Sequence, residues 1–199
     1  MKKLFTLLLF TLTALPSIVL ADIAPEPDVF TDVQEYDDAY WEIRWLKEDG
    51  ILSGYPDGSF HPDDTINRAE FSKILAIAAY EFDAESADFT SWLDFYDIDQ
   101  DAWYAPYLHK LYDENVISGY SDKSFKPDND VNFAEAAKMT MLAFDSGELS
   151  SNGAWYQPYV DMVEDLGATP ESITSPDQLI TRAEMAVMIY ETAQAREAQ

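Results

Sequence analysis

Two arginines lie in a matching five-residue pattern, and arginine is a residue type that can hold an anion. Arg68 belongs to Ile-Asn-Arg-Ala-Glu at 66–70, and Arg182 belongs to Ile-Thr-Arg-Ala-Glu at 180–184. A guanidinium presents a planar fork of donors that fits a carboxylate. Because each pattern indicates the first turn of a helix, we expect free backbone N–H groups beside the guanidinium, and these would also favour an anion.

Tryptophans at corresponding positions add a second kind of chemistry. The sequence Trp-Tyr-Ala-Pro-Tyr that begins at Trp103 returns as Trp-Tyr-Gln-Pro-Tyr at Trp155. An indole face can cover the apolar side of a sugar ring.

The composition is that of a folded and strongly acidic chain. Its 199 residues are 47% hydrophobic and 14% aromatic, enough for one or two domains with a real core. Thirty-eight acidic residues against twelve basic ones give a formal net charge of -26. Such a surface repels nucleic acid phosphates and anionic lipids. The chain has no cysteine, which excludes disulfides, thiolate catalysis and cysteine-based zinc sites.

Catalysis, cofactors and metals are not indicated by the sequence. The chain has two histidines, of which His61 reads as an exposed loop residue and His109 lies on a predicted helix without a nucleophile motif nearby. An acidic segment that begins at Asp97 resembles the start of an EF-hand loop. Its sixth position is Ala102 instead of glycine and its twelfth is Leu108 instead of glutamate, so the match fails. We therefore expect a protein that is not an enzyme and that needs no cofactor or metal.

The N-terminus has the features of a signal peptide. Lys2 and Lys3 form a short positive region, residues 4–15 are apolar apart from threonines, and small or branched residues lead up to Ala21. We expect cleavage after Ala21, a short linker over 22–29, and export of the mature chain. An uncleaved membrane anchor is the alternative, although the apolar run is short for a membrane span.

An internal repeat dominates the rest of the chain. The first copy aligns with the second at one constant offset, which carries Phe30 onto Phe95 and needs no gap. Four blocks match in this way: 30–33 with 95–98, 50–55 with 115–120, 57–63 with 122–128, and 66–70 with 131–135. A third copy begins near Trp155 and ends with the pattern at 180–184, but it lacks the Gly-Tyr-x-Asp-x-Ser-Phe loop.

Each copy predicts a helix, a loop and a second helix. Apolar residues at helical spacing mark the first helix, and Tyr-Pro-Asp-Gly at 55–58 suits a tight turn. The second helix starts after Asn67, Asn132 or Thr181, each followed by a glutamate at the third position after it. This is a capping box, so we interpret the three glutamates as structural.

Together these patterns resemble the S-layer homology (SLH) family over roughly residues 30–195. The resemblance rests on Phe-x-Asp-Val, a tryptophan, Gly-Ile-x-x-Gly-Tyr-x-Asp-Gly-Ser-Phe-x-Pro and Ile-Thr-Arg-Ala-Glu. It implies a mainly α, pseudo-trimeric domain of three helix–loop–helix repeats around a central helical core. We expect motif one at 30–82, motif two at 95–145 and a degenerate motif three at 152–195.

The resemblance also implies a function. Members of the family bind secondary cell-wall polymers, which can carry a pyruvate ketal, in grooves between adjacent motifs. An arginine contacts the anionic group, while an aromatic residue and the glycine-containing loop support the sugar. Carried over to this sequence, the glycan-binding residues are Arg68, Arg182, Trp103, Trp155, Trp41, Gly54, Tyr55, Gly119 and Tyr120. The expected partners are an anionic cell-wall glycan and another envelope protein, and the expected location is the bacterial cell envelope or surface.

No single copy carries the complete family pattern. The first has Asp38 at the position of the tryptophan, for which Trp41 could substitute; the second has Phe133 in place of the arginine; the third lacks the loop. We therefore expect at most two family-type grooves. We also expect that replacing both Arg68 and Arg182 with alanine abolishes binding and barely changes the melting temperature. The alternative is a small envelope protein that acts through protein–protein packing, without binding a glycan.

Overall fold

The computed structural model describes residues 29–87, 93–144, 147 and 149–198. The expected signal peptide at 1–21, and all but the last residue of the linker, lie outside these residues. The described chain is mainly helical, as predicted, and contains isolated β-bridges but no β-sheet. The helices are α1 (Tyr40–Glu48), α2 (Arg68–Tyr80), α3 (Ala105–Asp113), α4 (Phe133–Phe144), α5 (Gln157–Asp165) and α6 (Arg182–Glu197).

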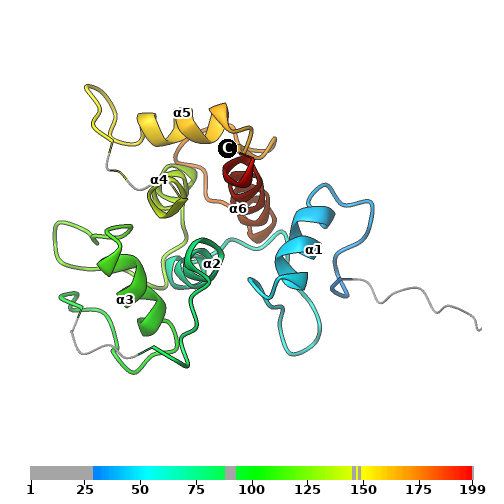
Figure 1. Ribbon diagram of the computed structural model, residues 1–199, viewed down its shortest axis with the longest axis horizontal. Coiled ribbons are helices and arrows are strands. Elements are labelled where there is room, and N and C mark those ends of the chain that lie inside the picture. The colour runs from blue at the N-terminus through cyan, green and yellow to red at the C-terminus, as the bar shows by residue number, and fades with distance from the viewer. Residues whose placement is uncertain (1–28, 88–92, 145–146, 148, 199) are drawn as a thin grey trace, which may run out of the picture.

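The inner helices α2, α4 and α6 pack against one another, and the outer helices α1, α3 and α5 surround them (Figure 1). Each outer helix packs on the inner helix of a different motif: α3 of motif two on α2, α5 of motif three on α4, and α1 of motif one on α6. The three motifs are therefore interlocked in a closed ring, and each buries its outer helix against a neighbour.

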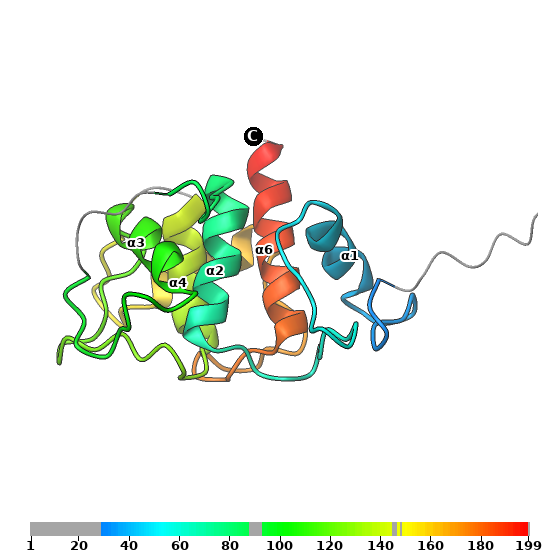
Figure 2. The same cartoon turned by 90° about the horizontal axis from the view of Figure 1, so that it is seen from below.

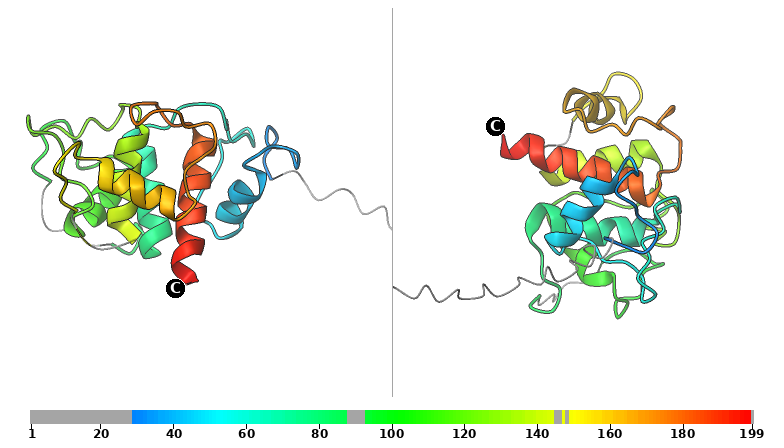
Figure 3. Two further views of the ribbon diagram at one scale, coloured as in Figure 1. Left: turned by 90° about the horizontal axis from the view of Figure 1, so that it is seen from above. Right: turned by 90° about the vertical axis from the view of Figure 1, so that its right-hand side faces the viewer.

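Backbone hydrogen bonds close the same ring at one end of the inner helices. The N–H of Ile66 donates to the carbonyl of Ile180 at 3.2 Å, that of Ile180 to Val131 at 3.0 Å, and that of Val131 to Ile66 at 3.0 Å. All three side chains are fully buried. Figure 2 shows the loops gathered at this end, with the C-terminus of α6 at the other end, and the views in Figure 3 agree.

The first turn of each inner helix is completed by a loop of a neighbouring motif. The N–H groups of Arg68, Phe133 and Arg182 donate to loop carbonyls of Asn129, Gln178 and Asp64 at 2.8–2.9 Å. The next amide of each helix, at Ala69, Ala134 and Ala183, donates to the carbonyl of Pro127, Pro176 and Pro62. Capping boxes satisfy the third amide, as predicted. The expectation of free N–H groups beside the arginines is therefore wrong, because loop carbonyls occupy those donors.

The Phe-x-Asp segment that opens each of the first two motifs, followed by valine in motif one and isoleucine in motif two, fixes the loop of its own motif. The Asp32 carboxylate accepts hydrogen bonds from the N–H groups of Phe60 and His61 at 2.7 and 2.8 Å. Asp97 does the same in motif two, for Phe125 and Lys126 at 2.8 Å. Because Phe60 and Phe125 are fully buried, each loop is anchored at its centre.

Removing one cap tests the role of these helix starts. The side chain of Asn67 accepts from the Glu70 N–H at 2.9 Å, so Asn67→Ala leaves that amide without its partner. We expect a loss of about 1 kcal/mol in the free energy of unfolding, measured by urea denaturation. Asn152→Ala, in an exposed loop, is the matched control and should change little. Equal stabilities for the two variants would contradict the assigned role of the cap.

Candidate functional site

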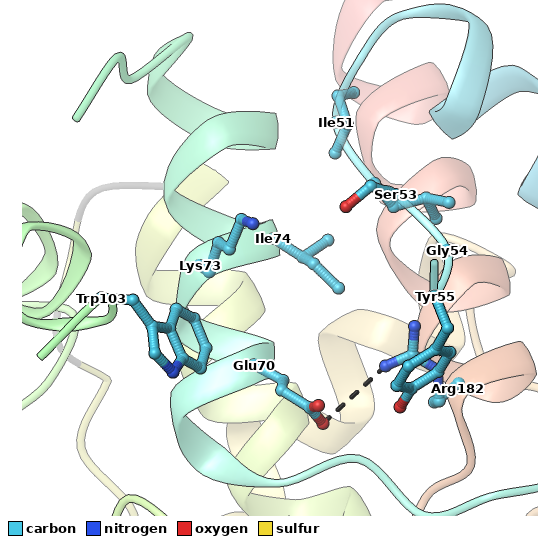
Figure 4. A pocket seen from close by; sticks show the side chains of 10 residues that line it. Ile51, Ser53, Gly54, Tyr55, Glu70, Lys73, Ile74, Trp103 and Arg182 are labelled. Carbon is cyan, nitrogen blue, oxygen red and sulfur yellow. Dashed lines mark ion pairs between the residues drawn. The ribbon is translucent and has the colours of Figure 1, made fainter. Parts of the chain in front are cut away.

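A pocket of about 220 Å³ lies where all three motifs meet, between Trp103 and the loop of motif one (Figure 4). We call it site one and define it by Tyr55, Glu70, Lys73, Trp103 and Arg182. Tyr55 comes from the motif one loop, Glu70 and Lys73 come from α2, Trp103 precedes α3 of motif two, and Arg182 begins α6 of motif three.

Arg182 reaches site one from motif three and is held from three directions. Its Nε donates to the carbonyl of Phe60 at 2.8 Å. Its guanidinium carbon lies 5.2 Å from the ring centre of Tyr55 and 4.7 Å from that of Phe60. Its Nη1 is 3.8 Å from Oε2 of Glu70, the ion pair drawn in Figure 4. The guanidinium is therefore oriented by the loop and by two aromatic faces.

A second set of side chains repeats this arrangement one motif further on. We call it site two and define it by Arg68, Tyr120, Glu135, Lys138 and Trp155. The Nε of Arg68 donates to the carbonyl of Phe125 at 2.8 Å, and its Nη1 is 3.4 Å from Oε1 of Glu135. Its guanidinium carbon lies 4.9 Å from the ring centre of Tyr120 and 4.6 Å from that of Phe125.

A lysine faces the tryptophan in each site. The Nζ of Lys73 is 5.8 Å from the Trp103 ring centre, and that of Lys138 is 5.8 Å from the Trp155 ring centre. Each site therefore sets two cations, arginine and lysine, against one carboxylate. In a chain of net charge -26, this is a local excess of positive charge beside an exposed aromatic face.

The two sites are complete because each takes its parts from all three motifs. Motif two has lost its arginine, but its loop meets Arg68 of motif one. Motif three has lost its loop, but its Arg182 meets the loop of motif one. The family residues that single motifs lack are therefore not missing from site one or site two.

A third position of the ring is formed by the first turn of α4 in motif two, the loop of motif three and the start of motif one. All the family residues that the three motifs lack are missing from this position. Phe133 stands there in place of the arginine and is buried, its N–H bonded to the shortened loop of motif three. Val187 of α6 corresponds to the lysine, and Asp38, before α1, corresponds to the tryptophan. Glu184 accepts hydrogen bonds from Ser172 Oγ at 2.6 Å and Gln178 Nε2 at 3.3 Å. Neutral donors have thus replaced the cation.

The predicted site residues separate into distinct roles. Trp103 and Trp155 are 56% and 52% exposed, in sites one and two. Trp41 is 59% exposed but lies on α1, where its ring faces the guanidinium of Arg44 at 5.8 Å. It belongs to neither site.

The two predicted glycines have a packing role. A Cβ on Gly54 or Gly119 would overlap the ring of Phe30 or Phe95, respectively, so each glycine lets the loop close over that ring.

Burial of the arginines bears on the expected stability of their variants. Arg68 and Arg182 are only 6% and 5% exposed. Their Nε atoms satisfy buried carbonyls, so replacing them also removes structural contacts. We therefore now expect the double alanine variant to have a lower melting temperature than the parent.

Sequence reasoning assigned only a structural role to Glu70 and Glu135 and missed Lys73 and Lys138. The glutamates do form the capping boxes, but each also lies within ion-pair distance of an arginine from another motif. The lysines are themselves related by the constant offset between the first two copies, which was the available signal.

The histidines lie in different surroundings. His61 is on the motif one loop, with Nδ1 3.1 Å from Oδ2 of Asp64 and its ring 4.7 Å from that of Tyr55. His109 is buried on α3, where burial lowers the pKa of the imidazole.

Among the helices of the described residues, none has the length and hydropathy to span a membrane.

The sequence of this chain is similar to those of bacterial surface proteins. The family model described as S-layer homology domain matches residues 29–72 and 94–137. The chain is 30% identical over 190 residues to the middle cell wall protein of Brevibacillus brevis, which covers 95% of this chain and 18% of that protein. It is 35% identical over 114 residues to the surface layer protein of Brevibacillus choshinensis, 57% of this chain and 10% of that one.

A third relative is the cellulosome-anchoring protein of Acetivibrio thermocellus, 30% identical over 128 residues, which cover 63% of this chain and 27% of that protein. The matched region spans less than a third of the length of each of these three relatives. The two segments matched by the family model correspond to motifs one and two, each starting one residue earlier. The structure places motif three in an equivalent position around the inner helices.

Burial of Arg68 leads to a direct stability test. Arg68→Ala should lower the free energy of unfolding by about 3 kcal/mol, because it leaves Glu135 and the Phe125 carbonyl without their buried partner. The control is Arg44→Ala, which removes an exposed pair with Glu48 and should change stability little. Urea denaturation of both variants measures the difference. An Arg68→Ala variant as stable as the control would show that the contacts across the motif boundary do not contribute to folding.

Proposed function

Because the chain belongs to the S-layer homology family, we propose that it is an exported module that attaches to the bacterial cell wall by binding wall polysaccharide at sites one and two. The observation that carries this proposal is the completion of both sites across motif boundaries. Arginine, lysine and tryptophan stand together twice, although no motif holds the full set.

The side chains of each site suit an anionic sugar. A guanidinium and an ammonium can neutralise one carboxylate of the ligand while the protein's own glutamate takes part of the arginine's charge. The half-exposed face of Trp103 or Trp155 can cover the apolar side of the ring. We propose a sugar with a single carboxylate, as a pyruvate ketal on a wall polymer would supply.

The overall charge of the protein shapes how such binding should respond to salt. A polyanionic wall polymer meets a chain of net charge -26, so the long-range field opposes binding. The screening length is about 8–10 Å at physiological salt, which weakens this field and leaves direct contacts largely intact. We propose that binding survives or improves as salt rises modestly.

The exposed tryptophans provide the sharpest test of function, because their removal should spare the fold. Trp103→Ala and Trp155→Ala should each weaken binding of the mature protein to purified sacculi in a pelleting assay by at least about threefold, as expected for loss of an aromatic contact to a sugar. Trp41→Ala, which lies on α1 outside both sites, should change binding little. The matched control is Tyr96→Ala, which removes an aromatic ring that is 74% exposed and outside both sites.

The same assay separates wall binding from protein–protein packing. Sacculi stripped of secondary wall polymer should no longer retain the protein, and the melting temperature of each tryptophan variant should match that of the parent. Full retention on stripped sacculi would instead support the alternative, an envelope protein that acts by packing against other proteins. Unchanged binding by both Trp103→Ala and Trp155→Ala would refute the assignment of the two sites.

A further inference from the structure

Sites one and two differ in what their tyrosine does. In site two, the hydroxyl of Tyr120 donates to Oε1 of Glu135 at 2.6 Å, the same oxygen that lies 3.4 Å from Nη1 of Arg68. In site one, the hydroxyl of Tyr55 has no hydrogen-bond partner among the side chains of the described residues, and Glu70 is 3.8 Å from Arg182. A short hydrogen bond from the tyrosine to a carboxylate is thus present in site two, whereas site one has no such bond among the described residues.

The sequence explains why the two loops differ. Tyr55 is followed by Pro56, and a residue before proline is restricted to extended backbone conformations, whereas Tyr120 is followed by serine. The glycine before each tyrosine differs in turn: Gly119 has a φ of 69°, while Gly54 is not among the residues with positive φ. The two tyrosines therefore leave their loops along different backbone paths.

The residue packed on each tyrosine differs as well. The ring of His61 packs edge-on against Tyr55, with ring centres 4.7 Å apart. In motif two, Lys126 replaces it, and the ammonium lies 4.1 Å from the Tyr120 ring centre. A second aromatic ring thus packs on Tyr55, and a second cation, besides Arg68, lies at the face of Tyr120.

Exposure of the two glutamates follows the same division. The Glu135 side chain is 17% exposed and that of Glu70 is 28% exposed. Glu70, Arg182 and Tyr55 all line the pocket of site one. A ligand anion at site one competes only with the ion pair between Arg182 and Glu70, whose atoms are 3.8 Å apart. At site two it must compete with a carboxylate that both Arg68 and Tyr120 already hold.

We propose that site one is ready to bind as folded, whereas site two is latched by the Tyr120–Glu135 hydrogen bond, which the ligand must break. Tyr120 is thus a positioning residue that sets the affinity of site two below that of site one. This inference rests on the proposed function, because it concerns the same two sites.

The latch is not a pH switch in the physiological range. Burial, followed by the hydrogen bond to Glu135, raises the pKa of Tyr120 to about 12. The phenol therefore keeps its proton, and can donate to Glu135, throughout the physiological pH range. Opening the latch requires a competing ligand and not deprotonation of the tyrosine.

Two variants, each with only one intact site, measure the difference in affinity between site one and site two. Trp155→Ala leaves site one to bind sacculi, and Trp103→Ala leaves site two. We expect half-saturation of Trp155→Ala at a lower protein concentration than that of Trp103→Ala, by about three- to tenfold, which is the net contribution of one typical hydrogen bond. Adding Tyr120→Phe to Trp103→Ala should lower the protein concentration at half-saturation by the same factor, because the aromatic ring stays and the hydrogen bond to Glu135 is lost.

Matched variants separate the latch from general effects of the ring. Tyr55→Phe added to Trp155→Ala breaks no bond to a glutamate and should give no such gain in affinity. Tyr96→Phe, outside both sites, controls for a lost hydroxyl, and thermal unfolding of each variant confirms that it folds. Equal half-saturation of the two backgrounds, or a gain from Tyr55→Phe equal to that from Tyr120→Phe, would overturn the latch. Parent protein that fails to bind sacculi would refute the proposed function itself.

Discussion

The N–H groups that begin each inner helix donate to loop carbonyls of a neighbouring motif, and the other features of the domain depend on this exchange. The three connecting segments bond to one another in a closed cycle through Ile66, Val131 and Ile180. Each outer helix then packs on an inner helix of a different motif. A single motif would leave its first-turn amides and the apolar face of its outer helix exposed, so the motifs are stable only as a ring.

This exchange explains how a chain with three defective copies retains two complete sites. Each site takes its arginine from one motif, its loop, glutamate and lysine from the next, and its tryptophan from the one after. Loss of the arginine at Phe133, of the loop in motif three and of the tryptophan at Asp38 therefore affects one position only. Under the proposed function, two sites of similar chemistry on one domain would permit a repeating polymer to be held at two points.

Much of the fold was predictable from sequence, because the capping boxes and the constant offset between copies mark the same helices. Helices α2, α4 and α6 begin at Arg68, Phe133 and Arg182, as predicted. The site was less predictable, since an offset between copies does not say which neighbour a side chain meets. Burial of Arg68 and its pairing with Glu135 depend on contacts between different motifs, far apart in the sequence. The hydrogen bonds of the first-turn N–H groups were not predicted for the same reason, because their acceptors belong to a neighbouring motif.

The central claim is that ligand binds at sites one and two and not at the third position of the ring. The indole N–H signals of the tryptophans in an NMR titration with fragments released from wall polymer report on this directly. The account predicts that the signals of Trp103 and Trp155 shift during the titration, whereas that of Trp41 stays in place. A shift of the Trp41 signal without shifts of the other two would contradict it.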